Sequence, residues 1–254
     1  MSLHQTRLPE NYLPAPDILR DRVILVTGAG QGLGRVAALD FARHGATVIL
    51  HGRSVTKLET VYDEIENMKC SQPAIMPLDF FSATQAELDG FAQAIHGNFK
   101  RLDGIFHGAT HFSTTMPLDL HNLDMWVQGA RVNMAVPAAL TKSCMPLLKK
   151  APDASVIFMT ETHAVSPKAF WGAFAATKAT LPAIVKIWQD EYEVENSVRF
   201  NLCLPGPVAS PMRAKSHPGE LASSLRQPES LGRAFVFLMG SDSKNVRGAL
   251  LSLD

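Results

Sequence analysis

The sequence is poor in cysteine, has no net charge and contains no long apolar run, and each of these features excludes a class of protein. The three cysteines, Cys70, Cys144 and Cys203, are too few and too widely spaced for a disulfide framework or a zinc ribbon. They fit a reducing compartment, so we expect the protein in the cytoplasm. No apolar run approaches the roughly 18 residues of a membrane span, and the N-terminus lacks the apolar segment of a signal peptide.

Positive and negative side chains balance. Lysine plus arginine number 24, and so do aspartate plus glutamate. A protein that binds nucleic acid through its phosphates needs a basic surface, so we expect no nucleic-acid partner, and the lack of an apolar span predicts no membrane partner. The hydrophobic fraction of 46% over 254 residues is instead typical of a globular protein with a full core.

Short apolar runs alternate with longer amphipathic ones from residue 21 onward. The apolar runs predict buried parallel strands over residues 22–27, 47–50, 74–78, 104–107, 155–160, 198–204 and 248–253. The amphipathic runs predict helices over residues 33–44, 54–68, 83–99, 122–149, 171–192 and 228–239. This alternation is typical of one doubly wound α/β domain, here residues 21–254, with a seven-stranded parallel sheet and helices on both faces. Residues 1–20 are expected to form a surface arm, and residues 206–227 a mobile loop beside the substrate.

A glycine-rich turn stands between the first predicted strand and the first predicted helix, where a dinucleotide-binding fingerprint has meaning. Gly28 lets the chain turn sharply, Gly32 lets the backbone approach a pyrophosphate, and Gly34 lets the helix pack close to the sheet. The free N–H groups of the helix N-terminus favour phosphate at this point. The remaining cofactor candidates of the turn are Gly30, Gln31 and Leu33.

The spacing Thr-Gly-x-x-x-Gly-x-Gly resembles that of the short-chain dehydrogenase/reductase family, and the likeness extends over nearly the whole chain. Residues 102–110 lie where the family has its fourth strand and an Asn-Asn-Ala-Gly motif. Asn133 matches the family's helix asparagine, and Lys178 matches the lysine of its Tyr-x-x-x-Lys motif. The resemblance implies a Rossmann fold that binds a nicotinamide dinucleotide. It also implies cofactor contacts from Ala109, Lys178, Pro205, Gly206, Val208 and Ser210.

The end of the second predicted strand indicates which nicotinamide dinucleotide is bound. An NAD site usually has a carboxylate here, on the ribose 2′-hydroxyl. This chain has no acid at residues 50–54 and carries Arg53, whose guanidinium can hold a 2′-phosphate with two hydrogen bonds. We therefore expect NADP(H) in preference to NAD(H), with a solvated arginine as the alternative. The resemblance further implies that Asp79 and Phe80 meet the adenine, although Asp79 also fits a helix cap or a turn.

The catalytic pattern of the family is broken at two of its four positions. Phe174 occupies the place of the tyrosine that protonates the forming alkoxide, and Glu161, 13 residues earlier, occupies the place of the serine. Asn133 and Lys178 remain. Loss of a general acid lowers a rate by roughly 10²–10⁴-fold, and an ionised carboxylate beside a developing alkoxide raises the barrier further. We expect hydride transfer by the family's route to be very weak.

Three interpretations of this site stay open. In the first, the chain is an NADP(H)-binding oxidoreductase of unknown carbonyl or alcohol substrate with impaired catalysis, or a catalytically silent sensor or regulator. In the second, Glu161 is a replacement acid; an ion pair between Glu161 and Lys178 is the slightly favoured alternative. In the third, His163 or a neighbouring threonine serves another chemistry. His107, His111 and His163 lack the spacing of a zinc site, so no metal is expected.

The predicted long helices and the substrate end of the chain are rich in apolar residues. Helices 122–149 and 171–192 resemble those that pair across dimer axes in the family, so we expect a homodimer or a homotetramer. Packing of the same residues on the sheet is the alternative. Phe112, Phe170 and Trp171 are expected to wall the substrate pocket, which favours an apolar substrate.

Overall fold

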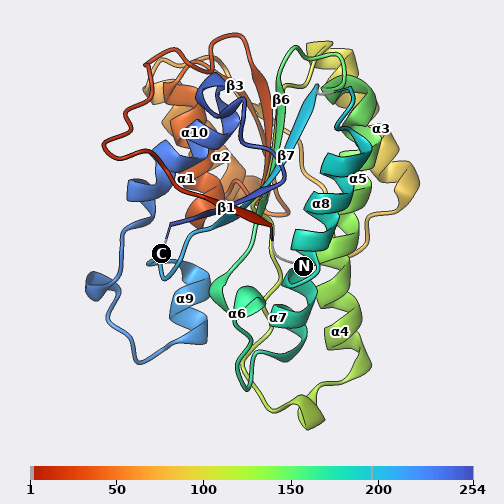
Figure 1. Cartoon of the computed structure of the whole chain (residues 1–254), viewed down its shortest axis with the longest axis vertical. Helices are drawn as coiled ribbons and strands as arrows, with labels where there is room; N and C mark the ends of the chain where they lie inside the picture. The colour runs from red at the N-terminus through yellow and green to blue at the C-terminus, as the bar shows by residue number, and fades with distance from the viewer. Residues whose placement is uncertain (1–2, 196, 254) are drawn as a thin grey trace.

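Eight parallel strands form one sheet in the computed structural model, which describes residues 3–195 and 197–253 (Figure 1). The strand order is β1-β8-β7-β6-β5-β2-β3-β4, and every neighbouring pair is parallel. The strands are β1 (His4–Thr6), β2 (Val23–Thr27), β3 (Thr47–His51), β4 (Ala74–Ile75), β5 (Gly104–His107), β6 (Ala154–Met159), β7 (Val198–Leu204) and β8 (Ala249–Ser252). The predicted doubly wound parallel fold is confirmed.

The count of seven strands was wrong, because β1 lies inside the segment expected to be a surface arm. This three-residue strand pairs with β8, which would otherwise be the edge of the sheet, and His4 lies opposite Ala249. Its side chains, His-Gln-Thr, are polar and exposed or half-buried. Backbone hydrogen bonds to an existing edge form this strand, so it leaves no apolar run in the sequence.

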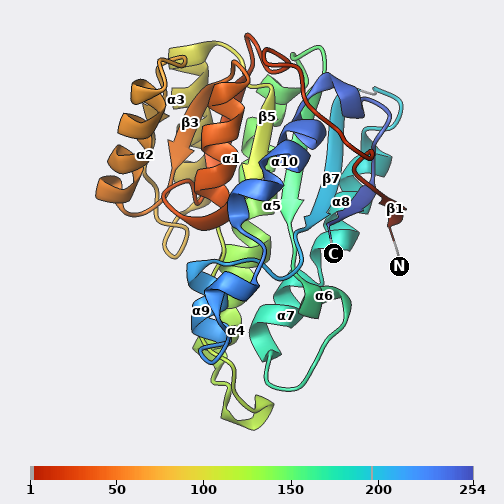
Figure 2. The ribbon, with the colours of Figure 1, turned by 90° about the vertical axis from the view of Figure 1, so that its left-hand side faces the viewer.

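Helices cover both faces of the sheet (Figures 1 and 2). In Figure 1, α1, α2 and α10 lie on one side, and α3, α5 and α8 on the other. The helices are α1 (Gly32–Arg43), α2 (Val55–Asn67), α3 (Gln85–Phe99), α4 (Leu123–Ala130), α5 (Val136–Leu148), α6 (Thr162–Val165), α7 (Gly172–Lys178), α8 (Leu181–Glu191), α9 (Pro211–Ser216) and α10 (Gly232–Met239). Because side chains alternate along a strand, β2 contributes Ile24 and Val26 to one core and Val23 and Leu25 to the other.

The two long predicted helices are interrupted in the structure. Between α4 and α5 the chain takes one π-helical turn at Arg131–Ala135, which contains Asn133. The predicted helix 171–192 divides into α7 and α8 around Ala179 and Thr180, next to Pro182 in the first turn of α8. Proline lacks an N–H and is favoured in the first turn of a helix, which is the position of Pro182 in α8. This break leaves Lys178 at the last position of α7.

The order of strands locates the place where a ligand binds. From β2 the chain proceeds to β3 and β4 on one side and then crosses to β5 on the other. In such sheets the crevice outside the carboxyl ends of the strands at this switch point receives the ligand. Thr27, the last residue of β2, is paired with His107, the last residue of β5, so both strands end at the same level.

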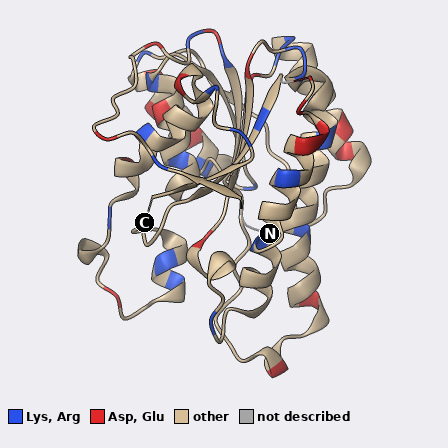
Figure 3. Cartoon of the chain, viewed as in Figure 1, with Lys and Arg blue, Asp and Glu red and all other residues tan. Residues whose placement is uncertain are grey.

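In the view of Figure 3, basic and acidic residues are interspersed over the helices and loops. Within residues 3–195 and 197–253, no helix has the length and apolarity needed to cross a bilayer.

Candidate functional site

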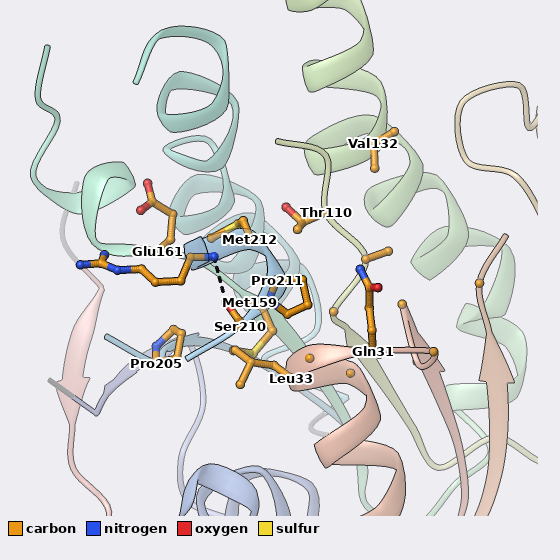
Figure 4. Close-up of a pocket in the computed structure, with 18 of the residues that line it drawn as sticks. Gln31, Leu33, Thr110, Val132, Met159, Glu161, Pro205, Ser210, Pro211 and Met212 are labelled. Atoms are coloured by element: carbon orange, nitrogen blue, oxygen red, sulfur yellow. Dashed lines mark hydrogen bonds between the residues drawn. The ribbon is translucent and has the colours of Figure 1, made fainter. Parts of the chain in front are cut away.

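A cavity of about 600 Å³ lies at the carboxyl ends of the strands, a volume within the range of small-molecule sites. Its lining residues come from the turn after β2, from the ends of β3, β5 and β6, and from the segment that follows β7. Figure 4 shows Gln31 and Leu33 on one side of this pocket and Glu161, at the start of a short helix, on another. The predicted residues that line it are Gly28, Gly30, Gln31, Gly32, Leu33, Gly34, Arg53, Asp79, Phe80, Ala109, Glu161, Phe174, Lys178, Pro205, Gly206, Val208 and Ser210.

The glycine-rich turn has the close contacts that its sequence predicts. Gly28 has a φ of +71°, and a Cβ there would lie 2.8 Å from the backbone nitrogen of Ala109. A Cβ on Gly34 would lie 2.1 Å from the carbonyl oxygen of Gly28. Only glycine fits at either position. Gln31 precedes α1 in an extended conformation and provides no side-chain cap, so the first N–H groups of the helix remain available to an anion.

The pocket end beside β3 carries a cation and stacked rings. The Arg53 guanidinium carbon lies 4.7 Å from the centre of the Phe81 ring, and the side chain has no carboxylate partner among the described residues. Asp79 Oδ1 accepts the backbone N–H of Phe81 at 3.0 Å, so it serves as a turn residue as well as a pocket residue. Phe80 is buried, and its ring stacks on His51 with a centroid distance of 4.3 Å.

Sequence reasoning missed His51 and Phe81, which both line this end. Burial lowers the pKa of His51 to about 4, so the ring is neutral at pH 7. Its Nε2 lies 3.1 Å from the carbonyl oxygen of Leu78. The ring of Phe81 makes a cation–π contact with the exposed Arg53. The only signal for this arrangement in the sequence was Arg53 followed by two phenylalanines after the next predicted strand.

Asn133 does not line the pocket, although it was expected in the catalytic set. Its Oδ1 accepts the hydroxyl of Thr110 at 3.1 Å and the backbone N–H of His111 at 2.8 Å. Its Nδ2 donates to the carbonyl oxygen of His111 at 3.0 Å and to Thr177 Oγ1 at 3.1 Å. The amide thus uses all four of its hydrogen-bonding positions within the protein. It holds the loop after β5 against α7.

Phe174 and Lys178 project from α7 into the pocket. The Phe174 ring is buried and packs against Phe112 and Trp171, at centroid distances of 5.2 and 6.0 Å. Lys178 Nζ donates to the carbonyl oxygen of Met159 at 2.9 Å. Burial lowers the pKa of Lys178 to about 8, and the nearby Glu161 opposes that shift in part.

The expected ion pair between Glu161 and Lys178 is not formed. Glu161 Oε2 lies 3.0 Å from His163 Nδ1, and its other oxygen is buried without a hydrogen-bond partner among the described residues. His163 in turn stacks on Trp171, with ring centroids 3.7 Å apart and planes 10° apart. Because Lys178 donates to the carbonyl oxygen of Met159 in β6, the carboxylate of Glu161 pairs with His163 instead. His163, the residue named in the third interpretation, is buried in α6 and lines the pocket.

The three histidines that the sequence places near the cleft have different surroundings. His107 is buried behind the pocket, with Nε2 2.8 Å from Thr141 Oγ1. The rings of His111 and Phe81 form a T-shaped contact, with centroids 4.9 Å apart. Within the part of the chain that the structure describes, no three His, Cys, Asp or Glu side chains are placed to share a metal ion.

The substrate end of the pocket is apolar, with one correction to its expected walls. Phe112, Trp171, Phe174 and Ala175 form a buried cluster, against which Met212 packs. Phe170, in contrast, is 55% exposed and does not line the pocket. The loop over residues 206–227 contains α9, and its Lys215 donates to the carbonyl oxygen of Phe112 at 3.3 Å. This contact places α9 over the apolar cluster.

Together, the doubly wound sheet, the glycine turn and the pocket at the switch point define a dinucleotide-binding protein of the α/β class. Comparison with known proteins gives the family. The family model for short chain dehydrogenase matches residues 22–221. The chain belongs to this short-chain dehydrogenase family.

Individual relatives match over almost their full length. YciK of Escherichia coli K12, an uncharacterized oxidoreductase, is 36% identical over 238 residues, 94% of each protein. A short chain dehydrogenase from Shigella flexneri, solved with NADP, superimposes with a TM-score of 0.91 at 35% identity, over 94% of this chain and 99% of that one. A short chain dehydrogenase from Escherichia coli CFT073, solved with NADPH, gives the same TM-score, identity and coverage.

Proposed function

We propose that the pocket binds NADP(H) and that the protein is an oxidoreductase acting on a carbonyl compound or an alcohol. The observation that carries the cofactor choice is the exposed Arg53, held on Phe81, at a strand end without a carboxylate. A guanidinium there meets a 2′-phosphate with two charge-assisted hydrogen bonds. The relatives solved with NADP and NADPH support the same choice.

Different residues of the pocket would contact different parts of the cofactor. The N-terminus of α1 and the turn from Gly28 to Gly34 would receive the pyrophosphate. Asp79 and Phe80 would border the adenine, and Lys178, beside Met159, would meet the nicotinamide ribose. The segment Pro205, Gly206, Val208 and Ser210, with Ala109, would border the nicotinamide itself. A titration that follows nicotinamide fluorescence tests this proposal, which fails if NADPH does not bind.

The bound cofactor would supply or accept a hydride, and the protein must move the accompanying proton. Phe174, at the position of the family's proton donor, has no proton to give. We therefore propose that turnover by the family's tyrosine route is impaired. Lys178 remains in place to bind the cofactor, and Asn133 still fixes the loop after β5.

A second proposal is a catalytically silent protein that senses or responds to NADP(H). Two observations favour it, the missing phenol at Phe174 and the carboxylate of Glu161 where a hydroxyl belongs. NADPH binding without reduction of any compound in a broad carbonyl screen supports the sensor. Measurable turnover supports the enzyme.

We further propose that residues 21–254 act as one dinucleotide-binding domain and that the protein forms a homodimer or a homotetramer in the cytoplasm. Ile187 on α8 and Val127 on α4 are more than half exposed, which supports association through these helices. Leu140 on α5 and Val185 on α8 instead belong to the buried core. A molar mass independent of concentration and equal to one chain would refute the oligomer. The three cysteines are free thiols, which suits a reducing compartment.

A further inference from the structure

Glu161 and His163 form a largely buried pair, unlike two surface groups in contact. The two side chains are 12% and 11% exposed, and the atoms in contact are Oε2 and Nδ1, 3.0 Å apart. The stack on Trp171 fixes the plane of the His163 ring. A histidine whose orientation is set by a carboxylate on one nitrogen and by a stacked ring is arranged like the general acid–base of many enzymes.

The second nitrogen of His163 has no partner in the protein. Nε2 makes no hydrogen bond among the described residues, and it is not one of the fully buried atoms that lack one. His163 lines the same pocket as Phe174 and Lys178. With Nδ1 committed to Glu161, Nε2 is the ring atom left to meet a ligand in that pocket.

We propose that His163, positioned by Glu161 and Trp171, is the proton donor and acceptor that replaces the missing phenol. This inference rests on the proposed binding of NADP(H). In reduction, the carbonyl carbon receives the hydride, and the electron pair of the C=O bond moves to the oxygen. That oxygen takes the proton from Nε2 of the imidazolium. The ring keeps its Nδ1 proton toward Glu161 and is reprotonated by water, so carbonyl, NADPH and H⁺ become alcohol and NADP⁺.

The pair also resolves the conflict that Glu161 creates. A lone carboxylate opposes a developing alkoxide, whereas a carboxylate paired with an imidazolium is neutral overall and presents a donor to the oxygen. The other charged groups that face the pair are Lys178 beside Glu161 and His217 on the segment after α9, whose ring centroid is 6.4 Å from that of His163. His217 in turn faces Arg213 and Glu220.

The test compares three variants in reduction of a panel of four probes, benzaldehyde, 4-nitrobenzaldehyde, hexanal and cyclohexanone, with NADPH between pH 5.5 and 9. H163F keeps a ring against Trp171 and removes both nitrogens. E161Q keeps the shape and removes the charge, and H96F is the control, an exposed histidine on α3 that does not line the pocket. H163N replaces H163F if thermal unfolding shows that H163F is not folded.

We expect the wild-type rate to fall with rising pH, because the proposed donor must carry its proton. H163F should lose about 100-fold in rate, the low end for a general acid, and lose this fall with pH. E161Q should move the fall to lower pH, because the carboxylate stabilises the imidazolium. H96F should follow the wild type. NADPH affinity, measured by fluorescence, should be unchanged in H163F.

A readout without cofactor or substrate tests the same geometry. In the ¹⁵N spectrum of the neutral His163 ring, assigned by its loss in H163F, the proton should sit on Nδ1 and leave Nε2 bare. A proton on Nε2 would overturn the proposal. So would an H163F variant that binds NADPH and reduces a probe at the wild-type rate and pH dependence, or a wild type that binds NADPH and reduces no probe. Failure of the wild type to bind NADPH would refute the proposed function, while the ¹⁵N measurement still decides the pair.

Discussion

Lys178 donates a hydrogen bond to the carbonyl oxygen of Met159, 2.9 Å away, and not to the carboxylate of Glu161. The lysine thus ties the end of α7 to the last residue of β6, from which the pocket opens. Two charged groups of opposite sign share the pocket floor without direct contact. Lys178 is thus available for the proposed contact with the nicotinamide ribose, while Glu161 is paired with His163.

The buried lysine predicts a pH dependence of stability. Burial lowers the pKa of Lys178 from 10.5 to about 8. The folded state therefore releases this proton between pH 8 and 10.5 while the unfolded state keeps it, so stability rises with pH in that window. Relative to K178M, the wild type should gain up to about 3 kcal/mol in unfolding free energy from below pH 8 to above 10.5. Urea unfolding across this range measures it, with the exposed Lys168→Met as control, and parallel curves for wild type and K178M would refute it.

Restoring the family's groups should raise the rate. The double variant Phe174→Tyr with Glu161→Ser regains a phenol four residues before Lys178 and a hydroxyl in place of the carboxylate. We expect NADPH-dependent carbonyl reduction to increase by up to about 10²-fold over the wild type, because His163 already supplies part of the general-acid effect. The single variant F174Y should gain less, because Glu161 remains. A folded, NADPH-binding double variant no faster than the wild type would show that the missing acid is not the bottleneck.

Arg53 should discriminate between the two nicotinamide dinucleotides. A hydrogen bond to a charged group contributes about 1.5–3 kcal/mol, so R53A should weaken NADPH binding by about 10–100-fold. NADH, which lacks the 2′-phosphate, should bind wild type and R53A within about threefold of each other and serves as the internal control. Equal losses for both cofactors would mean that Arg53 does not read the phosphate.

Asn133 should matter for stability before it matters for chemistry. Its removal leaves the backbone N–H and C=O of His111 without their partners, at a cost of about 1–3 kcal/mol per group. We expect N133A to lower the unfolding free energy by about 2–4 kcal/mol. The matched control is N98A on α3, an exposed asparagine, with an expected change within about 0.5 kcal/mol. Similar unfolding curves for N133A and N98A would contradict this role.

The cofactor end of this protein follows from the sequence because its determinants are local. A glycine at a φ of +71°, a helix that begins at Gly32 and an arginine after β3 are each set by neighbouring residues, although the contact of Arg53 with Phe81 is tertiary. The alternation of apolar and amphipathic runs along the sequence likewise determined the doubly wound sheet. The exception is β1, a polar strand formed only by hydrogen bonds to an edge nearly the whole chain away.

The catalytic end was decided by tertiary structure. The sequence shows that Phe174 and Glu161 replace the family's tyrosine and serine, but it does not say which group Glu161 meets. That choice depends on Lys178 reaching Met159 and on Trp171 stacking against His163, contacts between α7, β6 and α6. Packing between elements orients these side chains, and no propensity or spacing along the chain encodes the direction in which a carboxylate points.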